Sequence, residues 1–220
     1  MNSFLIGAAT SNSGKTTLTM GLLRALKRRG LSVQPYKCGP DYIDTMFHAV
    51  ASGRESVNLD TFMSSEEHVR DLFTHYGEDA DCRVVEGVMG LFDGYDRSCG
   101  SSAEIARILN IPVVLVVSAR SVAYSVAPLI YGFKHFDERV SIAGVIFNMV
   151  ASENHYALLK SACDDAKVPC LGYVMRKEGM EVPGRHLGLT IQAKEKLDRL
   201  IDSVADEVEK HVDIEALINL

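Results

Sequence analysis

The residues Gly14, Lys15 and Thr16 follow an apolar segment and a run of small residues, and a leucine-rich segment comes after them. Small residues allow consecutive backbone N–H groups to curl around an anion, and a helix that begins at Lys15 directs the positive end of its dipole at the same place. Lys15 is therefore expected to contact the β- and γ-phosphates of a nucleotide, and the Thr16 hydroxyl to contact Mg²⁺. The usual spacing of such a loop would place a glycine at Ala9. The residues expected to bind the nucleotide in this loop are Asn12, Ser13, Gly14, Lys15, Thr16 and Thr17.

Acidic residues follow a second apolar segment, in "KCGPDYIDTMFH". Gly39 and Pro40 indicate a turn and then the start of a helix, with proline suited to the first helical position. On such a helix Asp41, Asp44 and His48 share one face. Two carboxylates at this place could hold Mg²⁺ or orient a substrate, although acidic residues in a first turn also complement the helix dipole. We interpret His48 as structural.

A third apolar segment, "CRVVEGVMGLFDG", contains Glu86 and then a glycine-rich loop with Asp93. A carboxylate directly after a strand lies where phosphate-loop folds place a second Mg²⁺ contact, usually through water. Asp93 is a weaker candidate because Asp-Gly is also a common turn. Asn148 closes the segment "GVIFN", where its amide could read the donor and acceptor pattern of a purine or simply cap a turn.

The elements that must position these residues alternate between two types. Short β-rich segments separated by stretches with helical spacing predict parallel strands with crossover helices, and near-continuous apolar strands require a sheet covered on both faces. The sequence therefore predicts an α/β fold, a three-layer sandwich of the P-loop NTPase type with a mostly parallel central sheet and helices on both faces. The functional loops are expected at the carboxyl ends of the strands. The predicted strands are 3–9, 31–37, 82–88, 111–118, 141–150 and 169–174.

Two segments carry a clear helical stripe. In the first, leucines 18, 22 and 26 recur on one face and Gly30 ends the helix. In the second, from Ala193 onward, apolar residues keep helical spacing beneath a strongly charged face. Both helices are expected to be amphipathic.

Charge and composition exclude several classes of partner. The chain has 220 residues, 47% of them hydrophobic, with a net charge of -6, and clustered Lys and Arg are what nucleic acids and anionic membranes require. Most of the negative charge lies in residues 192–220, with four Lys or Arg against eight Asp or Glu. We therefore expect no nucleic-acid partner and no membrane partner.

The cysteines and the N-terminus favour a cytoplasmic protein. Five cysteines are odd in number, spread along the chain and free of any CxxC pair, which suits reduced thiols. The N-terminus lacks a basic region before its apolar segment, and the longest aliphatic run, "IPVVLVV", is too short to span a bilayer.

Taken in order, these segments resemble one family. The stretches "SNSGKTTLTMGLLRAL", "VQPYKCGPDYIDTMFH", "VNLDTFM", "VVEGVMGLFDG", "GSSAEIARILNIPVVLVV", "AGVIFNMV" and "VPCLGYVMRKEGMEVPGRHLGL" are similar to the amino-terminal ATP-binding domain of the cobyrinic acid a,c-diamide synthase family. The segments "GPDYID" and "EGVMGLFDG" are the most specific. Related synthetases, including dethiobiotin synthetase, share the loop and the fold but look less similar between Lys37 and His48.

The resemblance implies ATP- and glutamine-dependent amidation of the a and c side-chain carboxylates of a corrinoid ring. ATP would phosphorylate a carboxylate, and ammonia would displace phosphate from the acyl phosphate. Lys15 and Mg²⁺ would stabilise charge on the transferring phosphoryl group, and the remaining task of the enzyme is positioning. No protein nucleophile is needed.

The resemblance also implies a role for each polar residue. Asp41 and Glu86 would hold Mg²⁺, while Asp44 and Asp93 would face the substrate and ammonia. Asn148 matches the position expected to recognise adenine. Two residues depart from the family pattern: Ser118 stands where an aspartate is expected, and Thr45 stands where a proline is usual.

The family continues into a glutaminase domain with a cysteine nucleophile. We expect residues 1–191 to form the amidoligase domain and residues 192–220 to form a C-terminal helix and the start of a linker to a glutaminase domain that is absent here. The expected partners are a small-molecule tetrapyrrole and that glutaminase domain, and a homodimer is compatible with the sequence.

Three alternatives stand beside this reading. A related synthase amidates a nickel tetrapyrrole, and a dethiobiotin-synthetase-like carboligase would use CO₂ and a diamine. A nucleotide-switch ATPase of the partitioning and septum-placement type belongs to a different class. Those ATPases place a second lysine at the position of Thr10 and commonly end in a basic or amphipathic membrane helix, which the acidic C-terminal segment contradicts.

Overall fold

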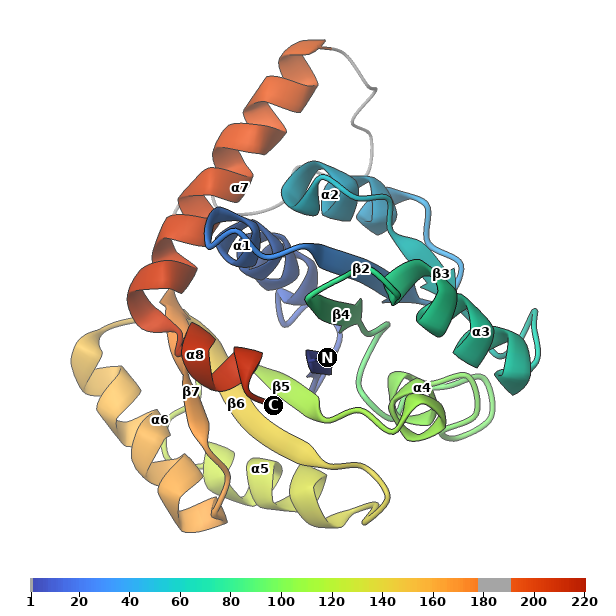
Figure 1. The fold of residues 1–220 in the computed structure, drawn as a ribbon. Coiled ribbons are helices and arrows are strands. Elements are labelled where there is room, and N and C mark those ends of the chain that lie inside the picture. The colour runs from blue at the N-terminus through green and yellow to red at the C-terminus, as the bar shows by residue number, and fades with distance from the viewer. Residues whose placement is uncertain (1, 178–190) are drawn as a thin grey trace.

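The computed structural model describes residues 2–177 and 191–220, which form a parallel seven-stranded sheet between two layers of helices (Figure 1). The strand order is β3-β2-β4-β1-β5-β6-β7, and every pairing of neighbouring strands is parallel. The part of the family-like sequence from Glu178 to Leu189 lies outside the described residues. The strands are β1 (Asn2–Ala8), β2 (Val33–Cys38), β3 (Val57–Leu59), β4 (Cys82–Glu86), β5 (Val113–Ser118), β6 (Ile142–Val150) and β7 (Cys170–Met175).

Six of the strands match the six predicted from the sequence, and β3 was missed. It has three residues and pairs with β2 at the edge of the sheet, from Tyr36 opposite Val57 to Cys38 opposite Leu59. Three residues are too few to show the alternation on which a strand prediction depends.

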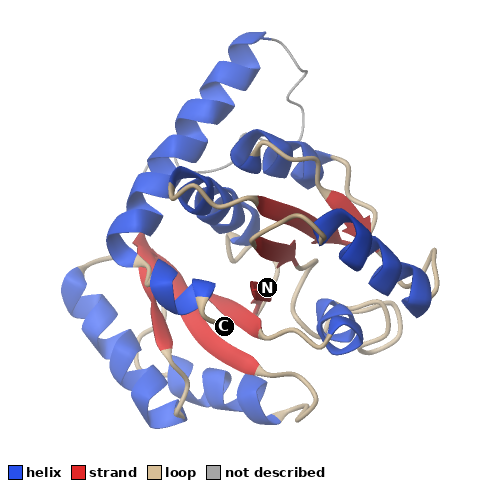
Figure 2. Cartoon of the chain, in the orientation of Figure 1, coloured by secondary structure: helices blue, strands red, loops and turns tan. Residues whose placement is uncertain are grey.

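The helices cover both faces of the sheet, which confirms the predicted three-layer α/β fold (Figure 2). One face is covered by α3, α4, α5 and α6, and the other by α1, α2, α7 and α8. The helices are α1 (Lys15–Arg28), α2 (Ile43–Ser52), α3 (Glu66–Gly77), α4 (Ser102–Leu109), α5 (Val126–His135), α6 (Glu153–Ala166), α7 (Ile191–His211) and α8 (Ile214–Ile218).

The central strands divide their side chains between the two cores. Leu5 packs into the core beneath α3–α6, whereas its neighbours Phe4 and Ile6 pack into the core beneath α1 and α7. Val114 and Leu115 divide in the same way. Both faces of each strand are therefore apolar, which explains why the strands read as continuous hydrophobic runs rather than alternating ones.

The C-terminal helix α7 belongs to the same core as α1. Leu197, Ile201, Val204 and Val208 are buried there. The two helices approach closely at Gly21, where a Cβ atom would lie 2.6 Å from Val204 Cγ1. Helices α7 and α8 therefore pack onto the α/β domain, and a linker to a glutaminase domain stays a prediction.

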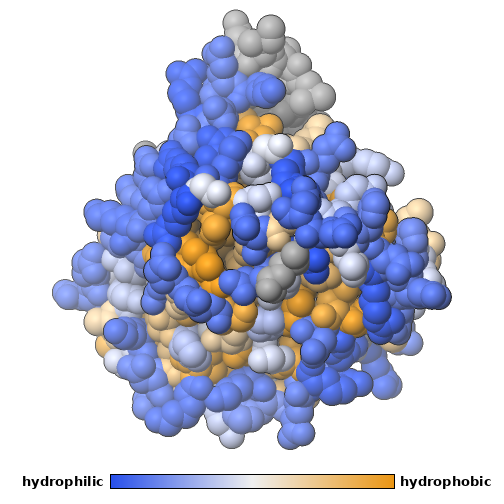
Figure 3. All heavy atoms as spheres, viewed as in Figure 1, coloured by the Kyte–Doolittle hydropathy of each residue, from blue (hydrophilic) through white to orange (hydrophobic). Residues whose placement is uncertain are grey.

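Ion pairs between α1 and α7 explain the acidic C-terminal segment. Arg24 contacts Asp198 and Asp202, each at 2.6 Å, and Arg28 contacts Asp202 and Asp206 at 2.9 and 2.7 Å. Figure 3 shows the outer side of α7 covered by hydrophilic side chains. Its negative charge is thus partly matched by the neighbouring helix, and no helix of the described residues is long and apolar enough to cross a bilayer.

Helix α2 begins later than the sequence predicts, so the placement of Pro40 at its first position is wrong. The helix starts at Ile43 because the Asp41 carboxylate accepts hydrogen bonds from the backbone N–H groups of Ile43 and Asp44, at 2.8 and 3.0 Å. Asp41 therefore lies before the helix and caps it, as an acidic residue ahead of a first turn often does. Asp41 and Asp44 do not share a helix face.

One buried ion pair joins β2 to β4. Lys37 and Glu86 are partners in the strand register, both side chains are almost completely buried, and Nζ lies 2.9 Å from Oε1. Burial alone would raise the pKa of Glu86, but Lys37 and His48 hold it well below its ordinary value. Burial likewise opposes the charge on Lys37, yet Glu86 and Asp44 raise its pKa above the ordinary value.

Replacing one partner of this pair should destabilise the fold in a pH-dependent way. Lys37→Met leaves Glu86 buried without its main partner, so the free energy of unfolding at pH 7 should fall by about 3–5 kcal/mol. In the parent chain the lowered pKa of Glu86 stabilises the fold above the ordinary carboxyl pKa, and this contribution is lost as the pH falls through the lowered value. In the variant, burial dominates and Glu86 takes up a proton at a higher pH, so the difference between the two proteins should shrink as the pH is lowered.

Urea unfolding of both proteins at pH 7 and pH 5 measures this difference. Lys160→Met, at an exposed position of α6, is the control and should change stability by no more than about 0.5 kcal/mol. A loss that is equal at both pH values would show that Glu86 stays charged without Lys37.

Candidate active site

A cavity of about 520 Å³ opens at the carboxyl edge of the sheet. Its walls come from the segments after β1, β2, β4 and β5 and from the end of β6, which is where parallel α/β sheets place their ligands. Its lining includes Lys15, Thr16, Lys37, Asp44, Met89 and Arg120.

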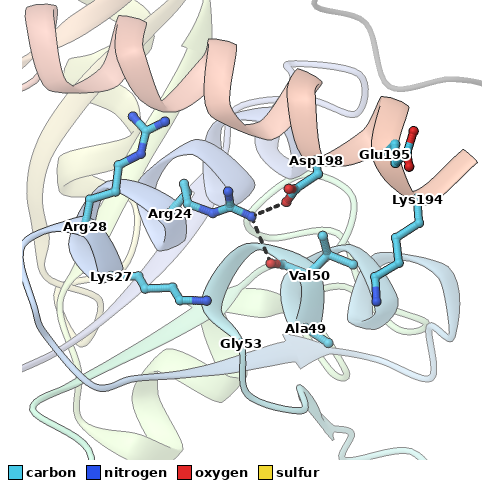
Figure 4. Close-up of a pocket in the computed structure, with 9 residues that line it drawn as sticks. All are labelled: Arg24, Lys27, Arg28, Ala49, Val50, Gly53, Lys194, Glu195 and Asp198. Carbon is cyan, nitrogen blue, oxygen red and sulfur yellow. Dashed lines mark hydrogen bonds and ion pairs between the residues drawn. The ribbon is translucent and has the colours of Figure 1, made fainter. Parts of the chain in front are cut away.

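A larger cavity, of about 850 Å³, lies between α1, α2 and α7 (Figure 4). It begins at Arg24, about 13 Å along α1 from Lys15 given the rise of a helix. The Arg24 guanidinium already donates to Asp198, at 2.6 Å, and to the Val50 carbonyl, at 3.0 Å. These contacts mark a packing junction between helices, so the smaller cavity is the better candidate for chemistry.

The loop between β1 and α1 has the backbone shape that the sequence predicts. Asn12 and Gly14 have φ values of 60° and 85°, so the chain turns tightly just before Lys15. Ser13 is buried and donates to the Thr10 carbonyl at 2.7 Å. A Cβ atom at position 14 would collide with the Asn148 amide, so this position requires glycine.

Lys15 lies at the start of α1 and reaches across the cavity. Its ammonium group donates to the carbonyl of Met89, in the loop after β4. Burial lowers the pKa of Lys15 from its ordinary value, and the Glu86 carboxylate partly offsets that effect. A neutral carbonyl is an acceptor that a phosphate oxygen can replace, and the replacement would add charge attraction to the hydrogen bond.

Thr16, Asp44 and Glu86 converge on one point beside Lys15. The Thr16 hydroxyl lies 2.7 Å from Glu86 Oε1 and 3.2 Å from Asp44 Oδ2. Lys37 Nζ lies 2.8 Å from the same Asp44 oxygen and 2.9 Å from Glu86 Oε1. Three elements, α1, α2 and β4, therefore bring one hydroxyl and two carboxylates together.

These oxygen donors fit Mg²⁺, the metal that a phosphate loop implies. Mg²⁺ commonly takes one or two carboxylates plus substrate phosphates and keeps several waters, so it does not need a cage of protein ligands. The described part of the chain accordingly contains no group of three or more His, Cys, Asp or Glu suited to a metal. Thr16, Asp44 and Glu86 are the residues that could hold the ion.

His48 is a support for Glu86. It is completely buried, its Nε2 donates to Glu86 Oε2 at 2.6 Å, and its Nδ1 lies 3.0 Å from the Ser56 hydroxyl. The structural interpretation of His48 agrees with this position.

Three of the predicted site residues make contacts other than those expected. Asp41 lines the cavity but uses one carboxylate oxygen to cap α2. Asp93 is exposed, accepts a hydrogen bond from Gly90 N at 2.9 Å and does not line the cavity. Asn148 donates to the Ser13 carbonyl at 2.9 Å and accepts from its neighbour's backbone, so its amide buttresses the phosphate loop. The roles of Asp93 toward substrate and of Asn148 toward adenine stay predictions.

Among the cavity residues to which sequence reasoning gave no role, Lys37, Met89 and Arg120 supply a charge or a hydrogen-bond acceptor. Lys37 ends a buried strand, and a buried lysine almost always has a partner, so its position was a usable signal. Met89 supplies its backbone carbonyl, which no side-chain pattern reveals. Arg120 follows β5 and lines the cavity with an exposed side chain.

Comparison with known proteins identifies a family. The CobQ/CobB/MinD/ParA nucleotide binding domain model matches residues 4–189. A cobyrinate a,c-diamide synthase of Listeria innocua is 45% identical over all of this chain and 50% of its own length. Hydrogenobyrinate a,c-diamide synthases of Brucella anthropi and Streptomyces coelicolor are 46% and 48% identical, covering 99% and 98% of this chain and 50% and 45% of their own lengths. The chain thus spans about half the length of the curated relatives it matches.

Among solved structures, chloroplast FtsY from Physcomitrella patens superposes with a TM-score of 0.57. The match covers 91% of this chain and 65% of that one at 14% sequence identity, so it shows a shared fold alone. The family model covers most of the chain, its phosphate loop included, and the chain belongs to the CobQ/CobB/MinD/ParA nucleotide-binding domain family.

Proposed function

We propose that this chain is the ATP-binding amidoligase part of a cobyrinate a,c-diamide synthase. The observation that carries the proposal is the convergence of Lys15, Thr16, Asp44 and Glu86 in one cavity. Curated a,c-diamide synthases match the chain over nearly all its length, which supports the choice of reaction. A glutaminase domain elsewhere in the full-length protein would supply ammonia, and the lack of a membrane-spanning helix among the described residues fits a cytoplasmic enzyme.

The proposed reaction has two steps. A side-chain carboxylate oxygen of the tetrapyrrole attacks the γ-phosphorus of ATP, the bond from that phosphorus to the bridging oxygen breaks, and ADP leaves. The nitrogen of ammonia then attacks the acyl carbon, the bond from that carbon to the phosphate oxygen breaks, and inorganic phosphate leaves while the nitrogen loses one proton, which the phosphate takes up, and keeps the two of the amide. The backbone N–H groups of the loop and the Lys15 ammonium stabilise the charge on the phosphoryl oxygens.

Thr16, Asp44 and Glu86 are the residues proposed to hold Mg²⁺. When bound, the ion would neutralise charge between the β- and γ-phosphates. Lys37 and His48 keep Glu86 ionised and fix its direction, and Lys37 also contacts the Asp44 carboxylate at 2.8 Å. The site is therefore preorganised by buried contacts.

The relatives do not decide which of two forms of the tetrapyrrole ring this chain accepts. Synthases named for cobyrinate and for hydrogenobyrinate are 45% and 46% identical to this chain. We therefore propose the class of substrate, a tetrapyrrole acid with reactive side-chain carboxylates, without choosing a ring metal. A homodimer stays compatible with the proposal.

Lys15→Ala should abolish ATP-dependent turnover, because the loop loses the one side chain that meets the β- and γ-phosphates. We expect a loss of at least about a hundredfold with the fold retained. ADP release and circular dichroism measure the two properties. Lys27→Ala, at an exposed position of the same helix, is the control and should behave like the parent chain. Unchanged turnover in a folded Lys15→Ala protein would exclude the phosphate-loop assignment.

Asp44→Asn and Asp41→Asn should separate a metal ligand from a helix cap. Asp44→Asn should slow phosphoryl transfer at least about a hundredfold and raise the Mg²⁺ concentration needed for half the maximal rate. Asp41→Asn should leave the Mg²⁺ titration nearly unchanged, since asparagine caps helices as well as aspartate does. A Mg²⁺ titration of each variant measures this. An equal shift for Asp41→Asn would restore the role that the family resemblance implies.

This chain should amidate with free ammonium and not with glutamine. A glutaminase needs a thiolate with a base beside it, and burial raises the pKa of Cys38 and Cys82 to about 12. Hydrogen bonding from Cys163 lowers the pKa of Cys170, but the polar side chains that contact it are Cys163 and Tyr156, and neither is a histidine.

Amide formation with each nitrogen source at saturating ATP measures this preference, before and after thiol alkylation. Amidation driven by glutamine and lost on alkylation would show a catalytic cysteine within this chain.

A further inference from the structure

Large hydrophobic side chains are exposed on loops at the edge of the sheet where the active-site cavity opens, and one of them, Met89, lines the cavity. They lie on the loops that follow β2, β3 and β4, and parallel strands end at the same edge of a sheet. Soluble proteins rarely gather exposed apolar side chains at one place without a binding role. The five side chains and their exposed fractions are Tyr42 (79%), Phe62 (72%), Met63 (74%), Met89 (46%) and Tyr95 (66%).

Phe62 and Tyr95 form an aromatic pair. Their ring centroids lie 5.2 Å apart at an interplanar angle of 68°, although the two residues come from different loops. Glu104 joins these loops, because one of its carboxylate oxygens accepts from Thr61 Oγ1 at 2.6 Å and from Gly100 N at 2.8 Å. The pair is therefore held in place at the surface by contacts behind it.

Backbone hydrogen bonds also hold the loops that carry these side chains. The Asp60 carboxylate accepts from the backbone N–H groups of Phe62 and Met63, at 3.2 and 3.3 Å. The loops after β2 and β3 are joined where Gly39 N donates to the Leu59 carbonyl at 2.9 Å. These exposed side chains stand on loops whose main chain is anchored.

Met89 connects this surface to the phosphate site. Its carbonyl accepts from Lys15, while its side chain is exposed. Its φ of 47° is costly for a residue with a long side chain, and such strain is common where a site requires a particular backbone shape. A single residue thus faces the phosphate-binding lysine with its backbone and the solvent with its thioether.

We propose that Phe62 and Tyr95, with Tyr42, Met63 and Met89, form the platform that binds the ring of the tetrapyrrole substrate. We call these five residues the ring platform. The inference rests on the proposed function and adds the place of the ring to it. Phosphoryl transfer needs only the reacting carboxylate inside the cavity, so the large apolar ring must lie outside against a surface of its own. Aromatic rings and flexible methionines suit a puckered ring edged with methyl groups.

Binding of cobyrinic acid to the chain tests the ring platform without turnover. The absorbance of the corrin ring reports its dissociation constant, and a nucleotide titration reports the dissociation constant of ATP. The double variant Phe62→Ser/Tyr95→Ser should raise the dissociation constant of cobyrinic acid at least about tenfold, because two ring contacts are lost, and should leave that of ATP unchanged. Tyr95→Phe keeps the ring and should bind like the parent chain.

Tyr76→Ser/Tyr131→Ser is the matched control, because it removes two exposed aromatic rings, 45% and 57% exposed, from α3 and α5. It should leave the binding of cobyrinic acid unchanged. If the first double variant also weakens ATP binding, Tyr42→Ser/Met63→Ser decides, since these are the two most exposed members of the ring platform. The same loss of cobyrinic acid binding is expected there.

The outcomes separate the two proposals. A parent chain that binds cobyrinic acid, with both double variants of the platform binding equally well, would overturn the ring platform and leave the proposed function standing. A parent chain that binds ATP but no tetrapyrrole would overturn both. A platform buried between two copies of the chain would give a dimer that Phe62→Ser/Tyr95→Ser disrupts while cobyrinic acid binding persists, and this result would also overturn the inference.

Discussion

The site depends on one carboxylate that has no access to solvent. A buried charge is tolerated only when partners replace its hydration, and Glu86 meets that condition with Lys37 from β2, His48 from α2 and Thr16 from α1. Each partner belongs to a different element. The cost of burying Glu86 therefore fixes the end of β4 relative to three neighbours, and the same contacts set the distance between the phosphate loop and the acidic residues.

Local sequence patterns predicted the secondary structure around this site and missed the contacts between its elements. The strand, small-residue loop and helix around Lys15 follow from periodicity and backbone freedom, which are properties of neighbouring residues. Lys37 was given no role, and the register with β4 shows which charge it meets, the buried Glu86 carboxylate. The amide of Asn148 was assigned to adenine, yet its partner, the Ser13 carbonyl, comes within reach only in the folded chain. The carboxylate of Asp41 was assigned to Mg²⁺, yet it also accepts from Ile43 N, a local contact typical of an acidic residue ahead of a helix.

The comparisons with known proteins also distinguish the fold from the residues of the site. FtsY shares the layers and the sheet at 14% identity, which shows how little of this sequence the fold itself demands. The a,c-diamide synthases share about 45% of residues with this chain. In this chain the segments that follow β2, β3 and β4 hold the exposed aromatic rings, and the acidic cluster lies at the ends of β2 and β4. A common scaffold thus carries chemistry in a few loops, as is usual for folds with many functions.

The position of α7 has a consequence for how the chain folds. The first strand and the last helices meet, since the Asn2 side chain donates to the Ile218 carbonyl, and α7 packs against α1 at Gly21 and pairs with Arg24. Contacts between such distant parts of a chain form late, because a long loop must close before they are gained. Until α7 docks, its own apolar side chains, Leu197, Ile201, Val204 and Val208, remain open to other chains, so the assembly of this core is a stage at which aggregation competes with folding.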